Sequence, residues 1–385
     1  MKKQAFNPYL PLYAYIPDGE PHLFGDRGYI YGSCDKEGGE TFCMGDYTVY
    51  SAPVDDLADW RQEGVIYRAE QDPDYGERKY MYAPDVVQGN DGRYYLYVTF
   101  VKPDEKMGTY VLVADRPDGP FRFAEGKGLS VPGTAEADSP AIVPDIDGEP
   151  FVDEDGKGYI FWRRRFAARL SDDKLHIEGE PVSIKTARQG YSEGPLMFKR
   201  KGIYYYVYTL SGHQNYANAY MMSRESPLTG FVKPEGNDIF LFSAPENQVW
   251  GPGHGNVFYD EGTDAYIFVY LEYGDGGTTR QVYANRMEFD EDGTIRTLVP
   301  DARGVGCLAA PQETRKNLAL QSHFYASSEK APRTSTVSIE TQPNQPLPDK
   351  GSVKNYTRTH TYQAAHVADE SNGTRWLAAD TDSSP

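Results

Sequence analysis

The sequence has few cysteines and no long apolar run, and both absences narrow the classes of protein it can encode. Its three cysteines are Cys34, Cys43 and Cys307, a spacing that gives neither a disulfide framework nor a metal-ligand motif, so reduced thiols are expected. No stretch approaches the roughly 20 apolar residues of a membrane span. The lysines of MKKQAFNPYL are not followed by the apolar segment of a secretory leader. We therefore expect a cytoplasmic protein with no membrane partner.

Positive charge is also scarce. The chain has 39 Lys and Arg residues against 57 Asp and Glu residues, which gives a formal net charge of −18. This balance disfavours nucleic acid and anionic membranes as partners. A neutral substrate such as a sugar is compatible with it, although the acidity is equally explained by solubility alone.

Aromatic and turn-forming residues are abundant by contrast. The 385 residues include 31 tyrosines, 38 glycines and 27 prolines. Tyrosine-rich and β-branched segments separated by Gly, Pro, Asn and Asp predict an all-β protein with many turns.

One strand pattern occurs five times, each time as a polar turn followed by alternating large apolar residues. The copies are GYIYGS at Gly28, GRYYLYVTF at Gly92, GKGYIFW at Gly156, GIYYYVYT at Gly202 and DAYIFVYLE at Asp264. Repeats of this length that contain only strands predict sheets arranged radially around an axis. The sequence therefore predicts a five-bladed β-propeller, with a β-sandwich of coincidental spacing as the alternative.

Three acidic turns precede these repeats. The tetrapeptide DGEP occurs at Asp18 and again at Asp147, and SEGP places Glu193 before the fourth repeat. Because propeller blades converge on one axis, we expect the three acids to face a shared pocket. The glycine after each aspartate is expected to permit unusual backbone angles and close approach of a ligand.

Three carboxyl groups in one pocket fit glycoside hydrolysis. One acid protonates the leaving oxygen, a carboxylate activates water or attacks the sugar, and a third can orient the acid and raise its pKa by repulsion. A single Asp-Gly is better explained as a turn, as we expect for Asp153 and Asp155. The recurrence of Asp18 and Asp147 in register with the repeat favours the functional interpretation.

Five motifs in order resemble glycoside hydrolase family 43, over about residues 6–310. They are NPYLPLYAYIPDGEPHLFGDRGYIYGS, YAPDVVQGNDGRYYLY, DIDGEPFVDEDGKGYIFW, YSEGPLMFKRKGIYYYVYT and WGPGHGNVF, the last followed by a predicted strand at Arg280. The family consists of five-bladed propellers that cleave β-xylosides and α-L-arabinofuranosides with inversion. The resemblance implies Asp18 as general base, Asp147 as orienting and pKa-tuning acid, and Glu193 as general acid. Inversion implies roughly 6.5–9.5 Å between the Asp18 and Glu193 carboxyl groups.

The sequence departs from the family pattern at both DGEP turns, where the family has Asp-Pro directly. An alignment without gaps keeps Asp18 as the base, and a shift of two residues would give that role to Glu20. At the second turn Asp147 is favoured over Asp145 and Glu149. A further departure is Arg163, where the family often has glycine, and we expect it to narrow or charge one side of the pocket.

The resemblance also implies residues that bind a cation or the sugar. His254 in GPGHGNVF would lie at the propeller axis and help to hold a hydrated cation, commonly calcium, with a structural role as the alternative. Arg280 would donate hydrogen bonds to sugar hydroxyls. Sugar rings have apolar faces, so aromatic side chains are candidates for the pocket wall, with packing between blades as the alternative for most of them. These candidates are Tyr82, Trp162, His213, Tyr216 and Trp250.

The composition changes near residue 312. We assign residues 1–311 to the propeller and residues 312–385 to a Ser/Thr/Pro/Gln-rich linker and the first part of a second domain. That part resembles a discoidin-like β-sandwich, a frequent carbohydrate-binding appendage, and a disordered tail is the alternative. With only part of a sandwich present, we expect the segment to be poorly ordered or to lean on the propeller.

The combined prediction is an inverting exo-glycosidase of xylan degradation. Its partner would be a xylo- or arabino-oligosaccharide, from which it removes β-D-xylosyl or α-L-arabinofuranosyl units. The alternatives are a five-bladed glycosidase that acts on galactans or fructosides, and a carbohydrate-binding propeller without catalytic activity.

Overall fold

The computed structural model describes residues 5–71, 80–101, 107–124, 141–274, 276–306, 322–340, 353–368 and 376–379. Strands account for 46% of the structure and helices for 5%. The all-β prediction is therefore confirmed. The few helices among the described residues are short 3-10 turns, and none is long and apolar enough to cross a membrane.

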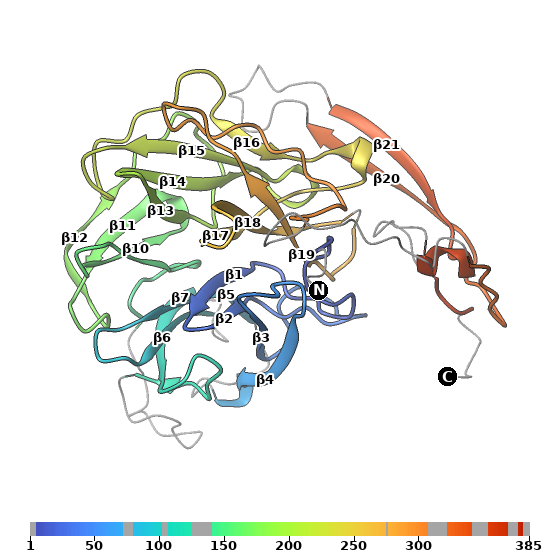
Figure 1. The fold of residues 1–385 in the computed structure, drawn as a ribbon, viewed down its shortest axis with the longest axis horizontal. Helices are drawn as coiled ribbons and strands as arrows, with labels where there is room; N and C mark the ends of the chain where they lie inside the picture. The colour runs from blue at the N-terminus through green and yellow to red at the C-terminus, as the bar shows by residue number, and fades with distance from the viewer. Residues whose placement is uncertain are drawn as a thin grey trace.

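Five antiparallel sheets form the body of the protein (Figure 1). Sheet one contains β1 (Glu20–Phe24), β2 (Arg27–Tyr31), β3 (Tyr47–Pro53) and β4 (Arg61–Tyr67), and sheet two contains β5 (Tyr80–Gln88), β6 (Tyr94–Val101), β7 (Met107–Ala114) and β8 (Arg122–Phe123). Sheet three contains β9 (Glu149–Val152), β10 (Gly158–Trp162), β11 (Phe166–Leu170) and β12 (Ile177–Ser183), and sheet four contains β13 (Leu196–Arg200), β14 (Ile203–Leu210), β15 (Ala217–Ser223) and β16 (Ile239–Phe242). Sheet five contains β17 (Gly255–Asp260), β18 (Ala265–Glu272) and β19 (Gln281–Met287). The short helices are η1 (Ala69–Gln71), η2 (Arg163–Arg165), η3 (His213–Asn215), η4 (Pro245–Asn247) and η6 (Ala364–Ala368).

The first strands of the five sheets form a closed ring. Strand β1 contacts β5 and β17, β9 contacts β5 and β13, and β13 contacts β17. Each sheet therefore radiates outward from a common axis, as Figure 1 shows in a view down that ring. This arrangement confirms the five-bladed propeller and excludes the sandwich alternative.

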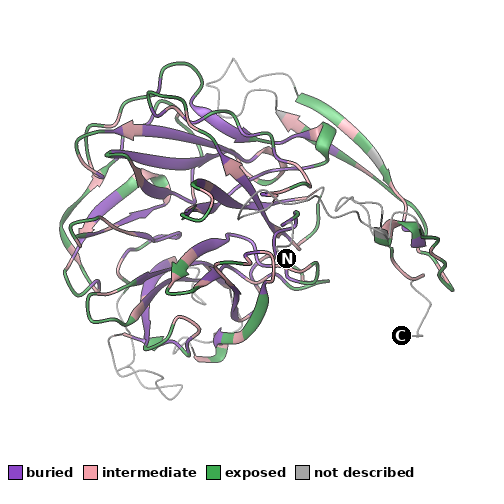
Figure 2. Ribbon diagram, in the orientation of Figure 1, coloured by how far each residue is buried: buried purple, intermediate pink, exposed green. Residues whose placement is uncertain are grey.

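The five repeats recognised in the sequence are the second strands of the blades. Strands β14 and β18 are buried along nearly their whole length because each blade packs between two neighbours. Burial on both faces explains why these strands are almost continuously aromatic or aliphatic, and not alternately apolar and polar. The polar turns before them need a left-handed residue, and Gly156 and Gly202 supply it with φ of 81° and 77°. Figure 2 shows the buried interior between blades and the exposed outer rim.

Five hydrophobic clusters fill the spaces between adjacent blades. Tyr47 and Phe100 belong to the cluster between blades one and two, while Trp162 joins the cluster between blades two and three. Blades four and five are joined through Tyr205 and Phe268, among others. The core is thus divided among blade interfaces, and the axis is left to polar side chains.

The two ends of the propeller segment close the ring. The Tyr9 amide donates to the Val282 carbonyl at 2.8 Å, and the Asn7 side chain exchanges two hydrogen bonds with the backbone of Ala284. The N-terminal segment therefore covers the outer edge of β19 in the three-stranded fifth blade. Gly19 and Gly255 form a further bridge between blades one and five.

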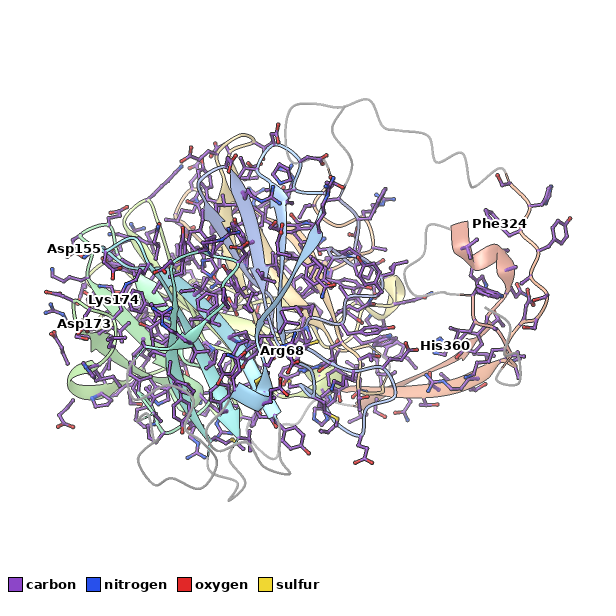
Figure 3. All side chains as sticks on the ribbon, turned by 90° about the horizontal axis from the view of Figure 1, so that it is seen from below. Arg68, Asp155, Asp173, Lys174, Phe324 and His360 are labelled. Carbon is purple, nitrogen blue, oxygen red and sulfur yellow. The ribbon has the colours of Figure 1, made fainter. Side chains whose placement is uncertain are left out.

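A two-stranded hairpin follows the propeller, made of β20 (Arg333–Glu340) and β21 (Val353–His360). The Tyr356 ring lies 5.6 Å from the Trp250 ring, and β20 contacts η3. In Figure 3 the hairpin with His360 is at the opposite end of the molecule from Asp155 and Lys174 of blade three. The described residues do not confirm a discoidin-like sandwich, which stays a prediction, and the predicted boundary at residues 311 and 312 lies outside them.

Candidate active site

The three predicted catalytic acids lie immediately before first strands of their blades. Asp18 and Asp147 precede β1 and β9 by two residues, and Glu193 precedes β13 by three. All three therefore lie at the same end of the axis. Gly194, next to Glu193, packs so closely on the His254 ring that a Cβ would lie 2.6 Å from Cγ. The structure thus brings the acids of blades one, three and four together around His254 of blade five.

The glycines of the two DGEP turns have a different function from the one expected. The left-handed residues are the aspartates themselves, with φ of 56° at Asp18 and 60° at Asp147. A Cβ on Gly19 would lie 2.7 Å from a Val282 methyl group, and one on Gly148 would lie 2.5 Å from Thr109. The glycines are therefore needed for packing against neighbouring blades, and the expectation of unusual glycine angles is wrong, while the expected close approach of a ligand stays a prediction.

Asp18 is held by donors from its own blade and by an arginine of blade five. The Ser33 hydroxyl donates to Asp18 Oδ2 at 2.6 Å and itself accepts a hydrogen bond from the Ala83 amide at 2.7 Å. Arg280 Nη1 lies 3.7 Å from Asp18 Oδ1. Asp18 therefore lies between a hydroxyl donor of its own blade and a guanidinium of blade five.

Arg280 is buried and mostly engaged by another carboxylate. Its Nε and Nη2 atoms each donate to Asp35 at 2.9 Å, and its backbone amide donates to Asp35 Oδ2 at 3.0 Å. The guanidinium also lies 4.5 Å from the centre of the Phe42 ring. Arg280 is therefore fixed beside Asp18, with Nη1 as the nitrogen directed towards the base. Asp35 precedes Arg280 by 245 residues, and no motif in the sequence pointed to it.

Asp147 is tied to the backbone of the Glu193 turn. Its Oδ2 atom accepts a hydrogen bond from the Gly194 amide at 3.0 Å, and its own amide donates to Thr99 Oγ1 at 3.1 Å. Burial raises the pKa of Asp147 to about 7; the charges of Glu193 and Asp18 add to this and His254 opposes it. Asp147 thus combines a geometric link to the Glu193 turn with electrostatic coupling to its carboxylate.

Hydrogen bonds fix both the side chain and the backbone of Glu193. Its two carboxylate oxygens accept hydrogen bonds from the hydroxyls of Tyr191 and Tyr216. Its amide donates to Thr209 Oγ1 at 3.0 Å, and the same hydroxyl donates to the Glu193 carbonyl at 2.5 Å. Burial and the Glu193 charge raise the pKa of both tyrosines, so both remain hydrogen-bond donors. Tyr191, two residues before the acid, was missed in the sequence, and half of its surface remains exposed.

A second set of acidic groups lies on the axis beyond Asp18. The ligand atoms of Glu20, Glu149 and His254, here called the axial cluster, lie within 4.8 Å of one another. Glu20 and Glu149 are the glutamates of the two DGEP turns. His254 Nε2 lies 3.3 Å from Glu20 Oε1, and Nδ1 lies 4.0 Å from Asp18 Oδ1. The His254 imidazole therefore lies between Glu20 of the axial cluster and Asp18, the predicted base.

The axial cluster has the character of a cation site. Both carboxylate oxygens of Glu20 are buried and accept no hydrogen bond from any described residue. Burial raises the pKa of Glu20 to about 7, and it also raises that of Glu149. The surrounding carboxylates raise the pKa of His254 to about 10 against the effect of burial. Excess negative charge and orphaned carboxylate oxygens fit a hard divalent cation, and an imidazolium at His254 is the alternative counter-charge.

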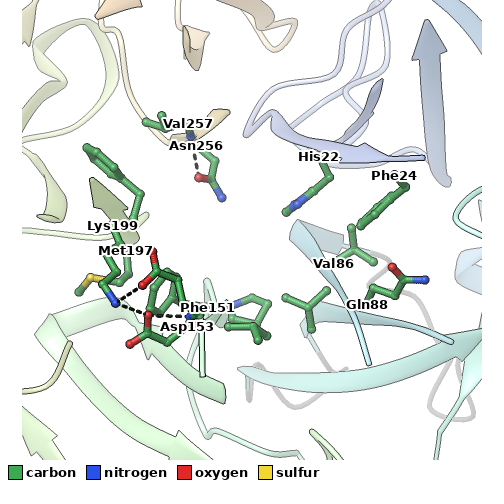
Figure 4. A pocket seen from close by; sticks show the side chains of 15 residues that line it. His22, Phe24, Val86, Gln88, Phe151, Asp153, Met197, Lys199, Asn256 and Val257 are labelled. Atoms are coloured by element: carbon green, nitrogen blue, oxygen red, sulfur yellow. Dashed lines mark hydrogen bonds and ion pairs between the residues drawn. The ribbon is translucent and has the colours of Figure 1, made fainter. Parts of the chain in front are cut away.

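A cavity of about 400 Å³ lies at the other end of the axis (Figure 4). It is lined by later residues of all five first strands, including His22 of β1 and Asn256 of β17. His22 Nε2 lies 2.5 Å from Asp85 Oδ1, and Asn256 donates to Glu149 Oε1 at 2.5 Å. This cavity therefore approaches the axial cluster from the side opposite to Asp18, Asp147 and Glu193.

The aromatic candidates for the pocket wall fall into two groups. His213 is exposed and stacks on Tyr273 with ring centres 5.1 Å apart, and Tyr82 is half-buried on β5. Trp162 and Trp250 are only 5% and 4% exposed. The structure places these two tryptophans in packing positions, Trp162 against Phe166 and Trp250 against the hairpin.

The alternatives to Asp147 have other partners. Asp145 forms an ion pair of 2.6 Å with Arg163 Nη2, and Glu149 belongs to the axial cluster. Asp153 and Asp155 accept hydrogen bonds from backbone amides of their own turn, which confirms them as turn residues. Asp147 is thus the aspartate of this region that reaches the Glu193 turn.

Carboxyl groups that converge at one end of a propeller axis have the chemistry that glycoside hydrolases require. The sequence profile described as Glycosyl hydrolases family 43 matches residues 25–295. The chain therefore belongs to glycosyl hydrolases family 43, and it is a glycoside hydrolase by that membership.

Relatives agree with this assignment. The chain is 36% identical over 332 residues to a xylosidase/arabinosidase of Thermoclostridium stercorarium, covering 77% of this chain and 67% of the relative. A solved glycoside hydrolase structure with 36% identity has a TM-score of 0.75, covering 96% of this chain and 78% of that one. Another solved structure is a β-xylosidase/α-arabinofuranosidase from a compost microbial metagenome, in complex with xylotriose and in a calcium-free form. It has a TM-score of 0.62 at 22% identity and covers 77% of this chain and 99% of that one. At this identity it supports the fold alone.

Proposed function

We propose that this chain is an inverting exo-glycosidase that releases β-D-xylosyl or α-L-arabinofuranosyl units from xylo- or arabino-oligosaccharides. The observation that carries the proposal is the convergence of Asp18, Asp147 and Glu193 around His254. The names of the relatives support the choice of sugars.

Glu193 is the proposed proton donor to the glycosidic oxygen. The Tyr191 and Tyr216 hydroxyls contact its two oxygens and fix the orientation of the carboxyl group. Asp147 orients the Glu193 turn through the Gly194 amide. Asp147 thus acts on the proposed acid through the backbone of its turn.

Asp18 is the proposed base that removes a proton from the attacking water. Ser33 occupies one of its oxygens, and Arg280 lies near the other. Inversion requires space for a water molecule between base and sugar, so we expect a separation of roughly 6.5–9.5 Å from Glu193.

The axial cluster is the proposed site of a calcium ion. Glu20, Glu149 and His254 would hold it, and it would supply positive charge close to the proposed base. This is tested by metal analysis of the purified protein and by thermal unfolding with and without a chelator. We expect bound calcium and a lower melting temperature after chelation, whereas Glu20→Gln should lose the chelator effect.

Hydrolysis of aryl β-xyloside and aryl α-arabinofuranoside tests the activity, and NMR of the first-formed sugar tests inversion. Glu193→Gln should lower kcat/KM on the preferred unactivated glycoside by roughly 10²–10⁴-fold while the melting temperature stays unchanged. Asp155→Asn, in the exposed turn between β9 and β10, is the matched control and should keep full activity. A Glu193→Gln protein with most of its activity, or a product with retained configuration, would contradict the proposal.

A further inference from the structure

The turn between β10 and β11 contains three consecutive arginines, Arg163–Arg165, and its backbone is strained. Arg164 and Arg165 have φ of 66° and 67°. Two successive left-handed residues other than glycine are uncommon, and they persist only where the surroundings determine the conformation. The surroundings here are the turns that carry two of the proposed catalytic acids.

The backbone of this arginine turn connects the two acids. The Arg163 amide donates to the Ile146 carbonyl at 3.2 Å, one residue before Asp147. The Arg164 amide donates to the Ser192 carbonyl at 3.4 Å, one residue before Glu193. Consecutive amides thus link the turns of blades three and four, directly behind the two carboxyl groups.

The arginine side chains strengthen the same link. Asp145 pairs with Arg163 Nη2 at 2.6 Å and lies 3.7 Å from Arg164 Nε. On the other side, Arg165 donates to the carbonyls of Gly190 at 3.1 Å and Arg188 at 3.3 Å. These interactions fix the segment that leads into Tyr191 and Glu193.

On the basis of the function proposed above, we propose that the arginine turn positions Glu193 for proton donation. Arg163 and Arg165 are positioning residues, because their guanidinium groups bind Asp145 and backbone carbonyls rather than the acid. The expected charging of the pocket by Arg163 is reduced because Asp145 pairs with it. The turn therefore acts by geometry, holding the Glu193 turn at a fixed distance from the Asp147 turn.

A misplaced general acid has a specific kinetic signature. Protonation is needed when the leaving group is a sugar hydroxyl, and it matters little for an activated leaving group such as 2,4-dinitrophenolate. A displacement of about 1 Å can cost roughly 100-fold in rate. For Arg165→Gln and for Asp145→Asn we expect kcat/KM on the oligosaccharide to fall by about 10–100-fold, with less than about twofold change on the dinitrophenyl glycoside.

Two further variants serve as controls. Arg169→Gln removes an arginine of the adjoining strand β11 that pairs with Glu178 at 3.2 Å, and it should leave both activities unchanged. Arg165→Lys retains a cationic donor and should recover part of the oligosaccharide activity. An equal loss on both substrates, or an undiminished rate on the oligosaccharide, would overturn the positioning function.

The same assay separates this inference from the proposed function. Glu193→Gln should show the same leaving-group selectivity, with a larger loss on the oligosaccharide. If Glu193→Gln loses activity equally on both substrates, the assignment of the acid fails. If Glu193→Gln is selective while Arg165→Gln and Asp145→Asn are not, only the positioning function of the arginine turn fails.

Discussion

The two DGEP turns have the same local structure and different surroundings. Both place a left-handed aspartate at the end of the axis, a glycine against a neighbouring blade and a glutamate in the axial cluster. Asp18 then meets a serine hydroxyl and an arginine, whereas Asp147 meets a backbone amide and the charge of Glu193. The partners supplied by other blades, rather than the turn itself, therefore distinguish a proposed base from a proposed orienting acid.

The glutamates of the two turns differ in the same way. Glu149 accepts a hydrogen bond from Asn256, while the oxygens of Glu20 have His254 as their nearby cationic group and accept no hydrogen bond from described residues. Within one axial cluster, Glu20 is thus the residue most dependent on a counter-charge.

The largest expected effect comes from removing the base. Asp18→Asn should lower kcat by roughly 10²–10⁴-fold, because water activation is needed whatever the leaving group. The loss should be similar on the oligosaccharide and the dinitrophenyl glycoside, measured by steady-state kinetics. Should Glu20→Gln show this uniform loss while Asp18→Asn stays active, the base would be Glu20.

A smaller and selective effect is expected at the second turn. Asp147→Asn should lower kcat/KM by about 10–100-fold on the oligosaccharide and much less on the dinitrophenyl glycoside, because it acts through the acid. Its pH–rate profile should also lose the ionisation near pH 7 that burial gives Asp147. Identical kinetics for Asp18→Asn and Asp147→Asn would remove the distinction between the two turns.

The smallest effect concerns stability and pH. Burial raises the pKa of Glu20 to about 7. The protonated carboxyl group therefore contributes fully to stability when the pH is below the ordinary pKa of a glutamate. This contribution is lost as the pH rises through about 7. In the presence of a chelator, the melting temperature should therefore fall between pH 5 and pH 8 by about 2–4 °C more in the wild type than in Glu20→Gln. Added calcium should reduce the difference. A wild-type curve parallel to that of Glu20→Gln would show that the carboxyl is not perturbed.

Much of the architecture could be predicted from sequence because the second strands carry a strong repeated signal. Burial between blades makes them aromatic, and their five copies gave the number of blades. The three acids were predicted because they precede strands in register with that repeat. Family motifs identified His254 and Arg280 by resemblance.

The partners of these residues could not be predicted, because they depend on how the ring closes. Asp35 contacts Arg280 only when blade five packs against blade one. The hydrogen bond from the arginine turn to the Glu193 turn likewise joins two different blades. The function of Gly19 was misjudged for the same reason, since its neighbour Val282 belongs to another blade. Residue type and closeness to a motif could not show whether Trp162 and Trp250 face the pocket, because a large aromatic side chain can equally fill a packing interface.

Closure of the ring by Asn7 and Tyr9 against β19 has a consequence for the order in which the protein matures during synthesis. Asp18 emerges from the ribosome early, but His254, Arg280 and the edge that receives the N-terminal segment are made more than 200 residues later. Contacts so distant in sequence form slowly. Until the last blade has been translated and has met the first, the nascent chain has separate blades but no assembled site, and it cannot yet hydrolyse a glycoside.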